Sequence, residues 1–71
     1  MSKESQLLDI VAEILELEVN EISFETKLDD SNWDSLAVVS FIAEVDSEFG
    51  KILSPKDVSS AENIKSLLDL I

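Results

Sequence analysis

The sequence predicts an all-α protein, a small antiparallel bundle of three main helices plus one short helix. Apolar residues recur at three- and four-residue spacing in three separate segments, which is the period of a helix with one buried face. The only glycine, Gly50, and the only proline, Pro55, stand between these segments, where helices end and begin. The one long segment without this spacing, residues 18–34, is too irregular for a strand.

Length and charge limit what such a bundle can do. Seventy-one residues make one domain, spanning 1–71, close to the lower size limit for an unaided hydrophobic core. Sixteen acidic residues stand against five lysines and no arginine, for a formal net charge of −11. Nucleic acid and anionic lipid both need clustered positive charge, so we expect neither as a partner. The charge instead favours protein partners that present basic patches.

The residue types that are missing exclude several functions. The chain contains neither cysteine nor histidine, which excludes disulfides, zinc sites built from these residues, cysteine nucleophiles and a Ser-His-Asp relay. We therefore do not expect an enzyme. No apolar run is long enough to span a membrane, and no signal peptide opens the chain. The expectation is a cytoplasmic monomer.

The first helix is predicted from Lys3 to about Leu17. Ser2 fits the capping position, and Glu4 lies near the positive end of the helix dipole. The apolar side chains that share one face are Leu7, Ile10, Val11, Ile14 and Leu17.

Residues 18–34 are predicted to form an ordered loop, with a short helical turn inside it. A connection of 17 residues is long for a compact domain, which indicates either function or an additional element. Four apolar side chains are expected to hold the loop against the bundle, namely Val19, Ile22, Phe24 and Leu28.

The second helix is predicted from Ser35 to Phe49, with Gly50 as its left-handed stop. At about 100° per residue its apolar side chains divide into two faces. The core face contains Val38, Phe41, Ile42, Val45 and Phe49.

A second, narrower stripe consists of Leu36, Val39 and Ala43, with a polar rim of Ser40, Asp46 and Ser47. A small apolar stripe with a polar rim is a candidate surface for partner proteins. The alternative is that the stripe packs on the long loop and contacts no partner.

Two further helices are predicted after Gly50. Ser54 before Pro55 is typical of a helix start, and the helix that begins there has room for about one turn. Residues 59–62, Ser-Ser-Ala-Glu, fit a capping box that opens the third main helix. The apolar face of that helix would contain Ile64, Leu67, Leu68 and Ile71.

A calcium loop is one candidate site in the middle of the chain. Asp30-Ser31-Asn32-Trp33-Asp34 matches the opening of an EF-hand loop. The sixth position should be glycine and is Ser35, and the twelfth should be glutamate and is Phe41. We therefore predict no dedicated metal site and only weak, adventitious calcium binding by the clustered acids.

Ser35 is the candidate site with the clearest chemistry. It falls at the N-terminus of the second helix, where backbone N–H groups are unpaired and the dipole favours negative charge. A hydroxyl there is held at the surface, and a phosphate attached to it would be well placed. The alternative is that Ser35 is only a helix cap in an acidic helical docking module, because serine and aspartate are preferred caps.

Taken together, these features resemble the acyl carrier protein family over residues 5–71. The resemblance rests on Asp34-Ser35-Leu36 at the start of the second helix, the long loop before it and Phe49-Gly50 at its end. The short turn at Pro55 and the ending Leu67-Leu68-Asp69-Leu70-Ile71 complete it.

The resemblance implies that Ser35 carries a 4′-phosphopantetheine arm derived from coenzyme A. A separate, magnesium-dependent phosphopantetheinyl transferase would attach the arm, whose thiol then carries an acyl group as a thioester. Asp34 would dock the transferase, and Leu36 and Val39 would contact acyl-transferring or acyl-activating enzymes that present basic patches. The same surface would include Ser40, Ala43 and Asp46.

The resemblance also implies that an acyl chain retreats into the bundle. Its lining would come from the core faces of the last three helices, namely Val38, Ile42, Val58, Ile64 and Leu67.

The sequence departs from the family pattern at three places. Residues 30–33 lack the glycine that many members carry before Asp-Ser-Leu, and Trp33 is expected to pack in this part of the loop. Ser40 replaces a residue that is commonly acidic in fatty-acid carriers, and Ala43 replaces a larger apolar one. These departures indicate a specialised carrier, in polysaccharide, polyketide or amino-acyl chemistry.

Overall fold

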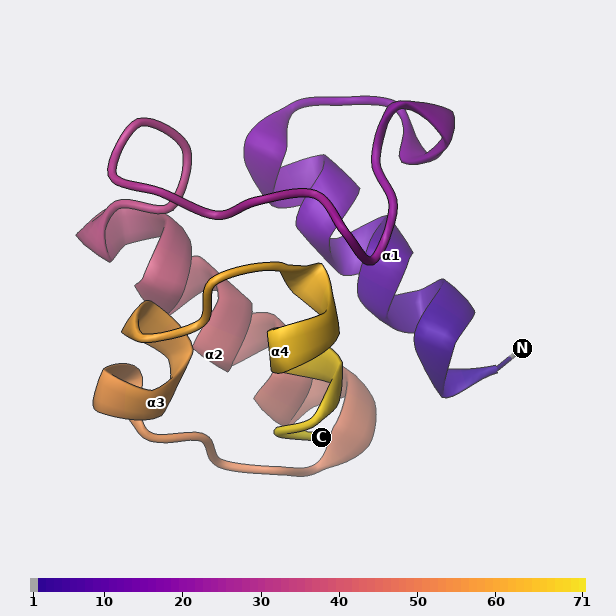
Figure 1. Cartoon of the computed structure of the whole chain (residues 1–71). Helices are drawn as coiled ribbons and strands as arrows, with labels where there is room; N and C mark the ends of the chain where they lie inside the picture. Colours follow the sequence, from indigo (N-terminus) through magenta and orange to yellow (C-terminus); the bar gives the residue numbers. More distant parts are fainter. Residues whose placement is uncertain (1) are drawn as a thin grey trace.

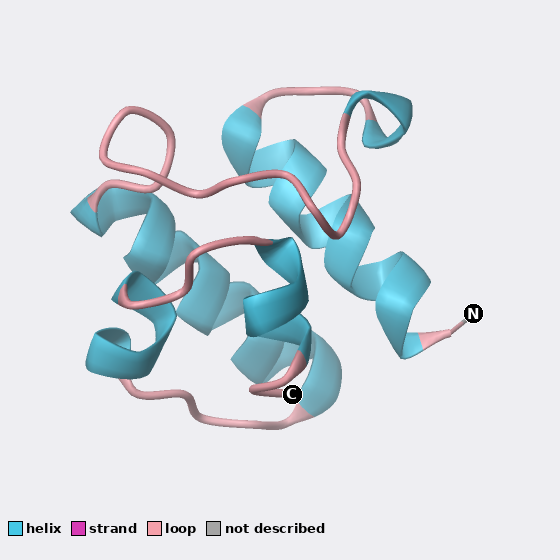
Figure 2. Cartoon of the chain, viewed as in Figure 1, coloured by secondary structure: helices cyan, strands magenta, loops and turns pink. Residues whose placement is uncertain are grey.

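The computed structural model describes residues 2–71 and confirms the all-α fold. Figures 1 and 2 show helices joined by loops. The described residues form four α-helices and one 3-10 turn, with no strand among them. None of the helices in 2–71 has the length and apolar character needed to cross a membrane. In chain order the elements are α1 (Lys3–Leu15), the 3-10 turn η1 (Val19–Glu21), α2 (Ser35–Phe49), α3 (Pro55–Ser59) and α4 (Ile64–Leu68).

The two long helices, α1 and α2, pack against each other in antiparallel directions (Figure 1). The short helices complete the core, since α3 packs on α2 and α4 packs on α1. All four helices contribute to this core, and each large side chain buried there stabilises the fold by about 1.5–3 kcal/mol. The most deeply buried large side chains are Leu7, Val11, Phe41, Val45, Val58, Ile64 and Leu67.

Helix α1 begins as predicted and ends two residues early. The Ser2 hydroxyl oxygen accepts a hydrogen bond from the Ser5 N–H at 3.1 Å, which caps the helix. At the other end, Glu16 adopts a left-handed backbone conformation with φ +60°, and the Leu17 N–H donates to the Ala12 carbonyl at 2.9 Å. This bond turns the chain out of the helix. Leu17 is therefore 43% exposed, and its predicted place on the buried face was wrong.

The long loop contains the predicted helical turn, η1. The Ile22 and Leu28 side chains are buried and Phe24 packs partly against the core, as expected. Val19 lies on η1 and is 44% exposed, so the prediction that it holds the loop in place was wrong. All three residues of η1 are exposed, so the whole turn lies on the surface and not Val19 alone.

Backbone hydrogen bonds fasten the loop to α4. The Leu28 N–H donates to the Glu62 carbonyl at 2.9 Å. In the other direction, the Ile64 N–H donates to the Thr26 carbonyl at 3.2 Å and the Lys65 N–H to the Phe24 carbonyl at 3.0 Å. The loop thereby satisfies N–H groups at the start of α4 that would have no partner inside the helix.

The predicted capping box at residues 59–62 was wrong. Ser59 ends α3, and the hydroxyls of Ser59 and Ser60 donate to the Lys56 carbonyl at 3.1 and 2.8 Å. The cap of α4 is Asn63, whose side-chain oxygen accepts the Ser66 N–H at 2.9 Å. Helix α4 has only five residues and is therefore not a third main helix. It begins late because Asn63, just before it, pairs with Lys27 of the long loop.

Helix α2 has the predicted bounds. Gly50 follows it as the left-handed cap, with φ +65°. The predicted core face is confirmed, because Val38, Phe41 and Val45 are buried and Ile42 and Phe49 are partly buried.

Glu16, the left-handed cap of α1, is expected to lower the stability of the fold. A residue with a side chain is strained in this conformation, whereas glycine is not. We expect Glu16→Gly to raise the free energy of unfolding by about 0.5–1 kcal/mol, measured by urea denaturation.

Gly50→Ala is the matched control for this substitution. Its added Cβ would meet no atom within 4 Å, so the left-handed conformation alone should lower the free energy of unfolding, by about 1 kcal/mol. A lower stability for Glu16→Gly would contradict the strain assigned to Glu16.

Candidate functional site

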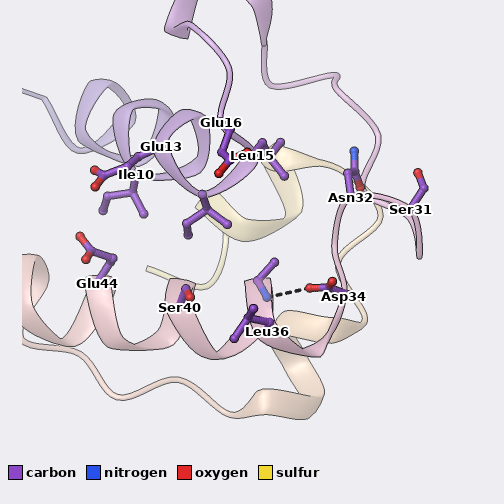
Figure 3. A pocket seen from close by; sticks show the side chains of 12 residues that line it. Ile10, Glu13, Leu15, Glu16, Ser31, Asn32, Asp34, Leu36, Ser40 and Glu44 are labelled. Carbon is purple, nitrogen blue, oxygen red and sulfur yellow. Dashed lines mark hydrogen bonds between the residues drawn. The ribbon is translucent and has the colours of Figure 1, made fainter.

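Asp34, not Ser35, caps helix α2. Its Oδ1 accepts a hydrogen bond from the Ala37 N–H at 2.9 Å, shown as the dashed line in Figure 3. Its carbonyl oxygen accepts the Val38 N–H at 3.0 Å. Ser35 is the first residue of the helix itself. The alternative prediction, that the Ser35 hydroxyl caps this helix, is therefore wrong.

The Ser35 hydroxyl is exposed and available. Among the hydrogen bonds formed within residues 2–71, none uses this hydroxyl as donor or acceptor. The first N–H groups of a helix have no intrahelical partners, and the dipole of the 15-residue α2 adds positive potential there. This position therefore suits a hydroxyl that carries a phosphate group.

Trp33 fixes the position of this helix start. Its indole is 5% exposed and its Nε1–H donates to the Val58 carbonyl of α3 at 3.0 Å. The ring also packs edge-to-face on Phe41, with 5.6 Å between ring centroids and an interplanar angle of 63°. The prediction that Trp33 packs in the loop is confirmed. The contact also holds α3 beside the start of α2.

A self-contained turn precedes Trp33. The hydroxyl and the N–H of Ser31 both donate to Asp29 Oδ1, and the Asp29 N–H donates to Asn32 Oδ1 at 2.8 Å. These Ser31 hydrogen bonds, the hydroxyl first, lower the pKa of Asp29 below its ordinary value. In residues 2–71 no group of three acidic side chains is arranged to hold a metal ion.

The predicted partner stripe is exposed on α2. Leu36 is 74% exposed, Val39 is 61% exposed and Ala43 also faces solvent. The alternative in which this stripe packs on the long loop is therefore wrong. The residues predicted around it also lie on α2, with Asp46 and Ser47 exposed and Ser40 partly buried.

A groove of about 430 Å³ adjoins Ser35, between the start of α2 and α3. Sequence reasoning missed the α3 part of this groove, because no local signal indicates which residues of α3 face α2. Among the described residues that line it, Lys56 is the only basic one. Its lining is Asp30, Trp33, Asp34, Ser35, Val38, Val39, Pro55, Lys56 and Ser59.

The five residues predicted to line an acyl pocket all belong to the core region. Val58, Ile64 and Leu67 are completely buried, Val38 is 5% exposed and Ile42 is partly buried. Val38 also lines the groove beside Ser35, so it connects this groove with the core.

Comparison with known proteins identifies one family. The family model described as "Phosphopantetheine attachment site" matches residues 5–71, nearly the whole chain. No solved structure matches the chain.

The geometry at the start of α2 predicts different roles for two adjacent residues. Asp34→Ala removes the capping oxygen and should lower the free energy of unfolding by about 0.5–2 kcal/mol. Ser35→Ala removes a hydroxyl without a partner and should change it by less than about 0.5 kcal/mol. Urea denaturation of both variants measures the difference. A larger loss for Ser35→Ala than for Asp34→Ala would contradict the assignment of the cap.

Proposed function

This chain belongs to the acyl carrier protein family, whose members carry a covalently attached 4′-phosphopantetheine arm, and we propose that Ser35 is its attachment residue. The observation that supports this most directly is an exposed serine hydroxyl without a hydrogen-bond partner in residues 2–71, at the start of α2. Because Asp34 already caps the helix, modification of Ser35 removes no structural hydrogen bond.

The residues around Ser35 fit a phosphate linked to an extended arm. Unpaired N–H groups at the start of α2 favour the negative charge of a phosphodiester there. Lys56 lines the adjoining groove and adds one positive charge, while Val39 and Pro55 provide apolar contacts. When bound, the arm supplies a thiol that carries an acyl group as a thioester. The chain itself needs no catalytic base for this role.

The exposed stripe on α2 supports contacts with partner enzymes. Leu36 and Val39 are large apolar side chains that face solvent near Ser35, and Asp34 and Asp46 add negative charge. We propose that the phosphopantetheinyl transferase and acyl-handling enzymes dock here through basic patches. Ser40 and Ala43 favour a specialised pathway, in polysaccharide, polyketide or amino-acyl chemistry.

Chemical modification tests the proposed attachment residue. Incubation with coenzyme A, magnesium and a promiscuous phosphopantetheinyl transferase should add the mass of one arm to the protein, measured by intact-mass spectrometry. Ser35→Ala should abolish the addition, because the accepting oxygen is gone. Ser5→Ala is the matched control, since it removes an exposed serine on α1 and should leave the addition intact. If the wild type gains no mass while the same transferase modifies a control carrier, the chain is a docking module and not a carrier.

We also propose that a loaded acyl chain enters the core between Val38, Ile42, Val58, Ile64 and Leu67. Each buried methylene would contribute about 0.8 kcal/mol at best.

Methyl NMR of the protein carrying a medium-length acyl chain tests this entry, with the protein carrying the unloaded arm as control. The methyl resonances of Val58 and Leu67 should shift, because both side chains lie in the packed core. Changes confined to the outer groove, at the methyl groups of Val39, would contradict entry into the core.

A further inference from the structure

Two adjoining hollows form a continuous furrow along the seam between α1 and α2. The larger has a volume of about 550 Å³ and extends from Leu36 to Glu44 on the α2 side (Figure 3). The smaller has a volume of about 200 Å³ and extends the furrow to Gln6 and Glu48. The two hollows share Ile10, Glu13 and Glu44 and together form one surface, the acidic furrow.

The floor of the acidic furrow is apolar. Ile10 and Ala37 are 6% and 8% exposed and provide its deepest part. Ile14 and Leu15 are partly buried and border it from α1. Leu36, which is mostly exposed, stands at one end. A ligand in the furrow would therefore bury apolar surface as well as meet charge.

The rim of the acidic furrow carries negative charge only. Figure 3 shows Glu13 of α1 and Glu44 of α2 on opposite sides of it, with Ile10 between them. No lysine occurs among the described residues that line it. Six of the sixteen acidic residues of the chain line this one seam, namely Asp9, Glu13, Glu16, Asp34, Glu44 and Glu48.

This arrangement of charge opposes folding. Asp9 and Glu13 are four residues apart on α1, and Glu44 and Glu48 are four residues apart on α2. Like charges at this spacing destabilise a helix, and the antiparallel packing adds repulsion across the seam. A cation held between the two helices would remove this repulsion, and the chain supplies none to the furrow.

We infer that the acidic furrow binds a basic amphipathic helix of a partner protein. Glu44 and Glu48 are one helical turn apart, about 6 Å along the axis, which matches lysines or arginines four residues apart on a partner helix. An apolar side chain between these cations would rest on Ile10 and Ala37. Nucleic acid and anionic membranes would be repelled by the same carboxylates.

Binding in the acidic furrow does not require the attachment residue. Ser35 lines the other groove, between α2 and α3, and is not part of the furrow. The inference therefore stands independently of the modification of Ser35. It also adds α1 to the proposed contact surfaces of this chain, and among the described lining residues the furrow and the Ser35 groove share only Asp34.

A synthetic helix tests this inference directly. The probe is a fluorescein-labelled 14-residue peptide of lysine and leucine, with lysines four residues apart on one face, titrated with the unmodified full chain. Fluorescence anisotropy should report binding, and amide NMR shifts should concentrate at Ile14 and Ala37. Replacing the peptide leucines by serine should weaken binding at least fivefold, because the apolar floor loses its contact.

Paired charge variants separate the acidic furrow from the overall charge of the protein. Glu13→Gln with Glu44→Gln should raise the Kd about five- to tenfold, because two charge contacts at the furrow rim are lost. Glu25→Gln with Glu62→Gln is the matched control, since it changes the net charge equally at exposed positions outside the furrow. That control should change the Kd less than twofold.

Three results would overturn the inference. One is equal weakening by the two double variants, which would assign binding to net charge alone. Another is a set of NMR shifts confined to Val39 and Ala43, which would place the peptide on the exposed stripe of α2. The third is no binding of the peptide by the wild type. The thermal unfolding of the furrow variant should be unchanged or shifted to higher temperature, which separates lost binding from lost structure.

Discussion

The hydrogen bond from the Trp33 indole to the Val58 carbonyl joins three parts of the chain at one buried point. It connects the end of the long loop and the start of α2 with the short helix α3. Val58, the acceptor in α3, follows Trp33 by 25 residues. If either buried group lost its partner, the cost would be about 1–3 kcal/mol, a large share of the stability of a small domain. Ser35 follows Trp33 by two residues, so its position relative to α3 depends on this contact.

The long loop is a structural element of the bundle and not a spacer. Its carbonyl groups at Phe24 and Thr26 accept N–H groups from the first residues of α4, and Leu28 donates in return. This pairing explains how 17 residues with little regular structure stay ordered. It also explains why α4 is short, since the residues before Asn63 run beside the loop instead of continuing a helix. Loop and helix therefore stabilise each other.

The surface around α2 has two chemically different sides. On one side, Lys56 and Ser35 line the same groove between α2 and α3, and the exposed stripe of Leu36 and Val39 continues along the helix. On the side that faces α1, carboxylates repel one another along a seam with an apolar floor. A net charge of −11 lowers the stability of a compact chain, and six of the sixteen acidic residues line this one seam.

The sequence by itself determined α2 from Ser35 to Phe49, because both of its ends carry local signals, an acid at the start and a glycine at the stop. It also determined which serine stands at the helix start. Only the tertiary structure decided that α1 ends at Leu15, with the left-handed Glu16 as its cap in place of a glycine, and that α4 begins after Asn63. The grooves on either side of α2 likewise depend on helices far apart in sequence. Periodicity within one helix shows which face is apolar, but not which neighbour covers that face.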